Sequence, residues 1–318
     1  MTEATRGHLA MLCFSALVAG SFSLGGLVAN EIAPAALQAA RFLLAALLTG
    51  GVVLATGQLR RAHLAAPWRY VVLAGFFATY FVLMFEGLKT AAPVSAAAVF
   101  TLIPIMAAGF GYLLLRQKMT PRIALGLAVG ASGALWVIFQ GSWSALLRFE
   151  IGRGEWVYFL GCICHAIYAP LVARFNRGES PLVFTAGILT AGALLLGLYG
   201  WRDVIATDWA ALPAIVWITL VYIATFATIA TFMLLQIASM RLPASKVMAY
   251  TYLTPSWVLL WELALGHGAP LPMVLGGVGL TVLALLILLR QEAPRAAATP
   301  APAAQAARSP RNARRHPD

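Results

Sequence analysis

The sequence contains little charge and only three cysteines. Asp, Glu, Lys and Arg make up 10% of its 318 residues, whereas soluble domains carry about 25%. A chain with so few charges cannot cover a globular surface with polar groups. This excludes a water-soluble enzyme as the default and disorder for most of the length. The cysteines, Cys13, Cys162 and Cys164, lie inside apolar stretches, so they give no disulfide framework and leave the redox compartment open.

Long apolar stretches dominate the rest of the chain. Apolar residues make up 61% of it, and a bilayer core is crossed by roughly 20 apolar residues of helix. Ten windows approximately meet this length, and only Arg41, Glu86 and Glu262 carry charge inside them. We therefore predict transmembrane helices at residues 9–28, 34–56, 70–88, 94–115, 123–140, 156–173, 181–200, 213–238, 247–266 and 271–289.

The two ends of the chain differ in character. The first window follows Arg6, as in a signal peptide, but its apolar stretch exceeds about 15 residues and no small-residue cleavage site follows it. We therefore predict that it stays in the protein as a span. Residues 291–318 are rich in Ala, Pro and Arg, which predicts a disordered, basic cytoplasmic tail.

Positive charges are unevenly distributed among the predicted loops. Alternate assignment of the loops to two sides places twelve Lys and Arg on the side of the N-terminus and four on the other. The positive-inside rule then predicts both termini in the cytoplasm of a bacterial-type plasma (inner) membrane. The net charge of +11 fits loops beside anionic lipids, and no basic face with interleaved aromatics indicates nucleic-acid binding.

The chain contains an internal repeat, with predicted halves at 1–148 and 149–290. Matching separations are 27 residues in Gly7–Pro34 and Gly154–Pro181, 17 in Pro104–Pro121 and Pro255–Pro272, and 22 in Pro104–Gly126 and Pro255–Gly277. Five crossings per half invert the second half relative to the first, an arrangement common in secondary transporters with a binding site near the midplane. The predicted fold is an all-α membrane protein with ten transmembrane helices as two inverted five-helix repeats.

The motifs of both halves resemble those of EamA-type transporters of the drug/metabolite transporter superfamily. They comprise Pro34 and Arg41, GLKTAAPVS at 87–95, LIP at 102–104, Gly126 and Gly133, ASMRLPAS at 238–245, LTP at 253–255 and Gly276-Gly277. The resemblance covers residues 7–290 and implies transport of a small metabolite or drug. The family usually has Glu thirteen residues after the proline of spans four and nine. This sequence has Gln117 and Gly268 there, so a mechanism based on those glutamates cannot be transferred.

Arg41 is the first candidate for a functional residue. It lies about two turns into the second predicted span, where an unpaired charge is costly and usually faces a cavity or a partner. The family resemblance points to the same residue after Pro34. The alternative is a structural arginine that reaches the outer interface or ties two helices together.

Two carboxylates are predicted near the outer ends of spans, where either can pair with Arg41. Glu262 lies in span nine and is expected to be the nearest acidic partner, and Glu86 lies in span three. A buried carboxylate can exchange protons near neutral pH, so Glu262 is also the candidate for proton coupling. For Glu86 the alternative is the capping of an exposed helix end.

The remaining candidates are polar or aromatic residues inside the spans. His165 lies beside Cys162 and Cys164, but steps of about 100° per residue point the two sulfurs apart, so no metal site is predicted. His165 either lines a cavity or is a hydrogen-bonded packing residue. Aromatic faces can stack flat substrates or contact lipid and other helices. The other substrate-pathway candidates are Gln38, Gln236, Tyr80 and Trp261.

The fifth predicted span contains a stripe of glycines. Gly126, Gly130 and Gly133 allow close helix packing, inside the protein or at a homodimer interface.

The predicted function is alternating-access transport, with export, of a small amphipathic metabolite such as an amino acid, a derivative or a drug-like compound. Membrane lipids are the other partner, and no catalytic residue or cofactor is predicted. Alternatives are import of a vitamin-like or nucleoside-like compound, a membrane-embedded enzyme around Arg41, Glu262 and His165, or a regulatory membrane subunit.

Overall fold

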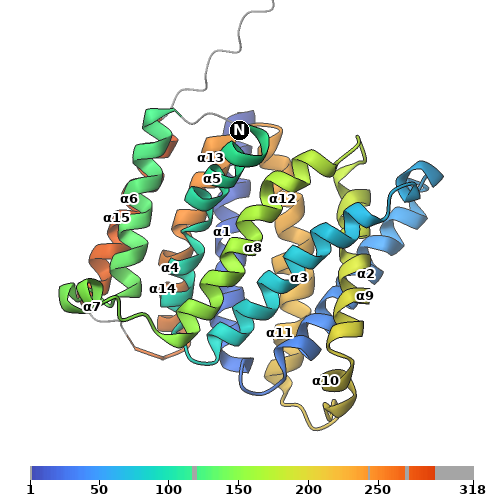
Figure 1. Cartoon of the computed structure of the whole chain (residues 1–318), viewed down its shortest axis with the longest axis horizontal. Coiled ribbons are helices and arrows are strands. Elements are labelled where there is room, and N and C mark those ends of the chain that lie inside the picture. The colour runs from blue at the N-terminus through green and yellow to red at the C-terminus, as the bar shows by residue number, and fades with distance from the viewer. Residues whose placement is uncertain (1, 117–119, 243, 269–271, 291–318) are drawn as a thin grey trace, which may run out of the picture.

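The computed structural model describes residues 2–116, 120–242, 244–268 and 272–290. Over these ranges the secondary structure is helical and contains no strand. Long helices run side by side between two ends of a bundle (Figure 1). The N-terminus lies at the upper end in this view, and the short helices α7 (Trp143–Arg148) and α10 (Trp201–Ala206) lie at the lower end. The predicted tail, 291–318, and Gln117 lie outside the described residues.

Nine helices of the described chain are long and apolar enough to cross a membrane. The spans are α1 (Glu3–Val28), α2 (Pro34–Ala55), α3 (Trp68–Leu88), α4–α5 (Pro93–Phe100 and Ile103–Leu115), α6 (Pro121–Ile138), α8 (Arg153–Phe175), α9 (Pro181–Tyr199), α11–η2–α12 (Ala214–Ala224, Thr225–Ala230 and Thr231–Ser239) and α15 (Pro272–Leu289). Two of these spans, α4–α5 and α11–η2–α12, are interrupted or change their helix type.

The predicted span at 247–266 is broken into three consecutive helical segments. These are α13 (Ala244–Ala249), η3 (Tyr250–Leu253) and α14 (Thr254–Ala264). None of them alone reaches the length of a span, which is why the count of long helices is nine where ten windows are predicted. The structure is therefore roughly consistent with the predicted ten spans.

Proline explains why the same break occurs in both halves. Pro104 lies in the first turn of α5, and Pro255 lies in the first turn of α14. Proline has no N–H to donate, so it is tolerated in the first turn of a helix and disrupts a helix that continues through it. The matched prolines of the sequence repeat thus occupy equivalent structural positions.

Helix contacts follow the exchange expected of an inverted repeat. The α3–α8 contact has its counterpart in α1–α12, and α5–α8 has its counterpart in α1–α14. Two further pairs, α2–α9 and α6–α15, join equivalent helices of the two halves. The core of the molecule therefore lies between the halves.

Glycines bring α6 and α15 into close contact. A Cβ on Gly133 would lie 2.7 Å from the Gly277 carbonyl oxygen, and a Cβ on Gly277 would lie 2.7 Å from that of Gly133. Gly130 faces the ring of Tyr252, and Gly126 faces Leu288. The glycine stripe packs inside the protein, which was one of its two predicted locations.

Candidate functional site

Arg41 lies in the interior of the helix bundle. It is the eighth residue of α2, about 10 Å along the helix from its start, and only 1% of its surface is exposed. Its guanidinium donates to the Thr228 hydroxyl from Nε at 3.1 Å and from Nη2 at 2.9 Å, and to the Gln38 side-chain oxygen at 3.3 Å. The same group lies 3.7 Å from the centroid of the Phe81 ring. Arg41 is thus held entirely by neutral partners.

The predicted ion pair between Arg41 and a carboxylate is wrong. Among the described residues, Glu86 pairs with Lys89 at 2.8 Å and Glu262 pairs with His267 at 2.8 Å, and Arg41 has no ion pair. Both carboxylates lie in the last turn of their helices, where a basic residue three or five positions later reaches them. Arg41 lies about two turns inside its helix, whereas both carboxylates are paired with neighbours at the ends of theirs. The alternative for Glu86 was a residue that caps an exposed helix end, and its partly exposed ion pair with Lys89 agrees with that alternative.

Thr228 comes from the one long helix that changes its winding among the described spans. Residues Thr225–Ala230 form the π-helical segment η2 between α11 and α12. The Thr228 hydroxyl donates to the Ile223 carbonyl, five residues earlier, at 2.7 Å. Its proton is therefore occupied, and its lone pairs face Arg41. π-Helical turns occur frequently at functional sites.

Aromatic side chains of α3 and α8 form a wall beside Arg41. Tyr80 lies 4.7 Å from Phe81 and 4.7 Å from His165, measured between ring centroids. Phe77 stacks on Tyr168 at 4.8 Å. The Tyr80 hydroxyl is hydrogen bonded to that of Tyr158 at 3.0 Å. The structure thus brings the candidates Arg41, Tyr80 and His165 into one neighbourhood, which we call the central cluster.

Two buried polar atoms of the central cluster have no hydrogen-bond partner. They are Nε2 of Gln38, whose residue is fully buried, and Nδ1 of His165. Among the described residues, the His165 side chain thus has no hydrogen bond, and its role in a cavity or in packing stays a prediction. Burying a polar group without a partner costs about 1–3 kcal/mol, so such atoms mark places where a ligand or water is accommodated.

Two other candidates, Gln236 and Trp261, are not joined to this cluster by a hydrogen bond or an aromatic contact among the described residues. Gln236 is half-buried in α12, and its side chain forms no hydrogen bond with another described residue. Trp261 is half-buried in α14 and packs edge-on against Tyr222, with 6.3 Å between ring centroids. Their presence in a substrate pathway stays a prediction.

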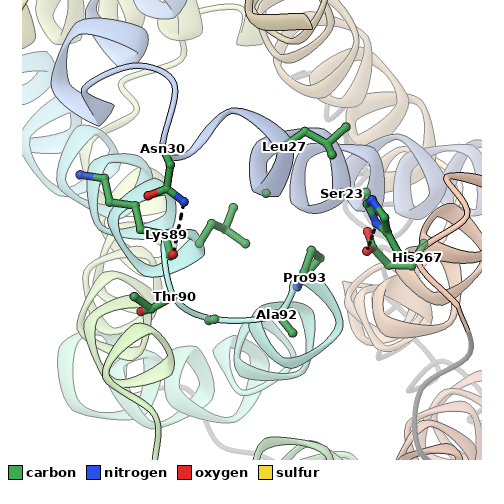
Figure 2. A pocket seen from close by; sticks show the side chains of 12 residues that line it. Ser23, Leu27, Asn30, Lys89, Thr90, Ala92, Pro93 and His267 are labelled. Carbon is green, nitrogen blue, oxygen red and sulfur yellow. Dashed lines mark hydrogen bonds and ion pairs between the residues drawn. The ribbon is translucent and has the colours of Figure 1, made fainter.

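A pocket with a partly polar lining (Figure 2) lies between helices of both halves, at the lower end of the bundle in Figure 1. It has a volume of about 360 Å³ and lies between the end of α1, the α3–α4 turn and the end of α14. Asn30 donates to the Lys89 carbonyl at 3.4 Å across it. Ser23 and Glu262 line it, and one buried oxygen of each side chain lacks a hydrogen-bond partner. Glu262 and Ser23 thus present unpartnered polar atoms next to this pocket.

The sequence did not identify a second buried arginine, Arg69. It lies in the first turn of α3 with 1% of its surface exposed, and it pairs with Glu179 at 2.7 Å. It also donates to the carbonyls of Ala66 and Phe175. Glu179 lies in the turn between α8 and α9 and also accepts the Arg177 N–H at 2.6 Å. Positive-inside counting assigns Arg69 to a loop, and no sequence signal predicts its partner 110 residues away.

The environment of Glu179 strongly favours its ionised form. Burial alone raises the pKa of this carboxyl, but the hydrogen bond from Arg69 and the N–H of Arg177 outweigh it and lower the pKa to about 2. Glu179 is therefore a permanent anion at physiological pH. The pair ties the first half to the second at the upper end of the bundle.

Comparisons with known proteins agree with this architecture. The EamA-like transporter family matches the chain twice, at residues 5–139 and 152–290. An uncharacterized transporter of Bacillus subtilis (strain 168), YyaM, is 27% identical over 288 residues, which cover 88% of this chain and 92% of the relative. A solved structure titled "Crystal structure of protein" has the same fold at a TM-score of 0.64 and 21% identity. The matched region covers 90% of this chain and 95% of the chain in the solved structure.

These matches cover both halves of the helix bundle. The two family copies include the helices that carry Arg41, the aromatic wall and the π-helical segment. The chain is a multi-pass membrane protein that belongs to the EamA-like transporter family.

Proposed function

We propose that this chain exports a small amphipathic metabolite across the inner membrane by alternating access. The observation that supports it best is the central cluster, in which a fully buried Arg41 has neutral partners only, between helices of both halves. A charge in such a place is costly and is typical of a substrate or ion pathway. An inverted repeat supports the same mechanism, since two equivalent halves can exchange roles around a central site.

Transport in this proposal is driven by a gradient, and protons are the proposed coupling ion. Glu262 supports this role because one of its oxygens is buried without a partner while the other contacts His267, whose side chain is 45% exposed. His267 thus offers a proton path between the pocket and Glu262. Glu262→Gln should change the pH dependence of flux, and an unchanged profile would argue against coupling through this residue.

The transport test uses purified protein in proteoliposomes with a panel of labelled small metabolites. We expect saturable flux of one or more compounds that is absent from protein-free vesicles. Sustained chemical conversion of a compound inside the vesicles, without net movement, would instead support a membrane-embedded enzyme.

Direction is tested in cells by metabolite profiling of a deletion strain. Intracellular accumulation of one amphipathic compound supports export. Intracellular depletion, with growth rescued by a high external supply, would reverse the direction to import.

The proposed orientation places both termini in the cytoplasm. Reporter fusions at residue 145 and after residue 290 should report opposite sides of the membrane. The same side for both would contradict the ten-span topology.

A further inference from the structure

We propose that the central cluster selects a small organic monoanion, a carboxylate on a flat apolar body, over zwitterionic amino acids and cations. This inference rests on the proposed function and names the substrate class of the same site. Three observations carry it: an excess of hydrogen-bond donors, the position of the acidic residues, and the aromatic wall.

The polar part of the cluster has more donors than acceptors. A guanidinium carries five N–H groups, and three hydrogen bonds from Arg41 are formed. Nε2 of Gln38 adds further N–H donors that have no partner. Thr228 already accepts two of the Arg41 bonds and donates its own proton to Ile223. A carboxylate supplies acceptors only, in the planar geometry that matches a guanidinium.

Charge balance favours the same ligand. The acidic residues of the described spanning helices lie in first or last turns, namely Glu3, Glu86, Glu155 and Glu262. At the level of Arg41 the described chain therefore offers no carboxylate to offset its charge. Because an unpaired buried ion is strongly disfavoured, an incoming anion gains more there than a neutral ligand.

The same arrangement disfavours an ammonium group. A zwitterionic amino acid would place its positive charge close to its carboxylate, and hence close to Arg41. The described side chains that accept hydrogen bonds from Arg41 are those of Thr228 and Gln38, both neutral. The Tyr80 hydroxyl of the same cluster is hydrogen bonded to that of Tyr158, and the nearest face of Phe81 is already covered by the guanidinium. The repulsion from Arg41 is then uncompensated, so the site discriminates against a second, positive charge.

The aromatic wall suits a flat apolar body next to the carboxylate. Phe77 and Tyr168 are stacked and half-buried, and Tyr80 and Phe81 continue the wall to Arg41. Aromatic rings prefer offset-stacked or edge-to-face contact with one another. At the far side, the unpartnered Nδ1 of His165 can bond one polar substituent of the ligand.

The test compares three ligands with one skeleton: 3-phenylpropanoate, L-phenylalanine and 2-phenylethylamine. Their affinities for the purified full-length protein in detergent are measured by calorimetry and by the shift in melting temperature. We expect 3-phenylpropanoate to bind at least about 10-fold more tightly than either of the others. Equal or tighter binding of phenylalanine or phenylethylamine, or no binding of phenylpropanoate, overturns the inference.

Two variants locate the selectivity. Arg41→Gln should lose the preference for the anion, whereas Arg148→Gln removes the same charge from an exposed position and should keep it. If Arg41→Gln does not fold, Arg41→Lys is used instead. This variant should keep the preference for the anion but bind 3-phenylpropanoate with lower affinity. A folded Arg41→Gln protein that retains wild-type affinity for phenylpropanoate overturns the assignment to this site.

The outcome is separable from that of the proposed function. Flux of other compounds in proteoliposomes without anion preference would refute only the substrate class. Selective phenylpropanoate binding without flux of any panel compound would support the anion site and refute transport.

Discussion

Arg41 and Arg69 are both buried to the same extent, and their surroundings are opposite. Each has 1% of its surface exposed. Arg69 meets the carboxylate of Glu179 and two backbone carbonyls, so its charge is offset by a buried counter-ion. Arg41 meets a hydroxyl, an amide and an aromatic ring. This is the difference expected between a structural arginine and the proposed ligand-binding arginine.

The positions of the two residues fit this distinction. Arg69 lies at a helix start and fastens the turn between α8 and α9. Arg41 lies between helices of both halves, next to η2. Burial alone therefore does not identify a functional charge in a membrane protein. The groups that surround a buried charge are needed for that distinction.

The largest expected effect is on stability, from breaking the Arg69 pair. Glu179→Leu leaves Arg69 buried without a counter-ion, which costs about 3–5 kcal/mol. The double variant Arg69→Met/Glu179→Leu should recover most of this loss, because neither charge remains. Thermal denaturation in detergent measures both. A double variant as unstable as the single one would show that the pair acts by something other than charge compensation.

The reverse pattern is expected for Arg41. Removal of its charge by Arg41→Met leaves no orphaned carboxylate and only deprives the buried Gln38 oxygen of its donor, so the melting temperature should fall less than in Glu179→Leu. Flux at low substrate concentration should fall about 10- to 100-fold, since hydrogen bonds to charged groups contribute about 1.5–3 kcal/mol. Normal flux would remove Arg41 from the mechanism.

A third prediction concerns pH and follows from the lowered pKa of Glu179. The folded protein holds this carboxyl at a pKa of about 2, against an ordinary value of 4.5. The stability it contributes is fully present above about pH 4.5 and is lost as the pH falls towards 2. Melting temperatures measured from pH 6 to 3 should therefore decline less steeply in Glu179→Gln than in the wild type. Parallel curves would contradict the assignment.

The smallest effect is expected for the exposed pair of Glu86 and Lys89. Both side chains are about one-third or more exposed, and exposed ion pairs contribute about 0–1 kcal/mol. Glu86→Gln should leave melting temperature and flux almost unchanged. A strong loss of flux would place Glu86 in the pathway despite its local partner.

The sequence predicted the scaffold well because lipid imposes simple rules. Apolar windows of sufficient length located the spans, and the matched prolines Pro104 and Pro255 indicated the repeat. The helix breaks beside these prolines were not predicted, although they follow from the missing N–H of proline. The glycine stripe predicted close packing for a similar reason. Each of these signals depends on the residue itself and its immediate neighbours.

The site was predicted only in part, because it depends on contacts between distant residues. The cost of a charge in lipid identified Arg41, yet the sequence suggested Glu262 as its partner because opposite charges attract. It did not indicate that His267, five residues later, satisfies Glu262 first. Thr228 and Glu179 carried no signal at all, since a hydroxyl in an apolar span and a glutamate in a loop are both ordinary.

The π-helical segment also bears on which insertions and deletions the protein tolerates. A single residue added to or removed from an α-helical span rotates everything beyond it by about 100°, which normally turns the packed face towards lipid. A π-helical turn carries one residue more than an α-helical turn, so deletion of one residue within Thr225–Ala230 can be absorbed by rewinding as α-helix. The chain can then keep its span and the packing on both sides of it, while Thr228 loses its place under Arg41. In this span, a change of one residue in length can thus alter the proposed ligand site without altering the fold.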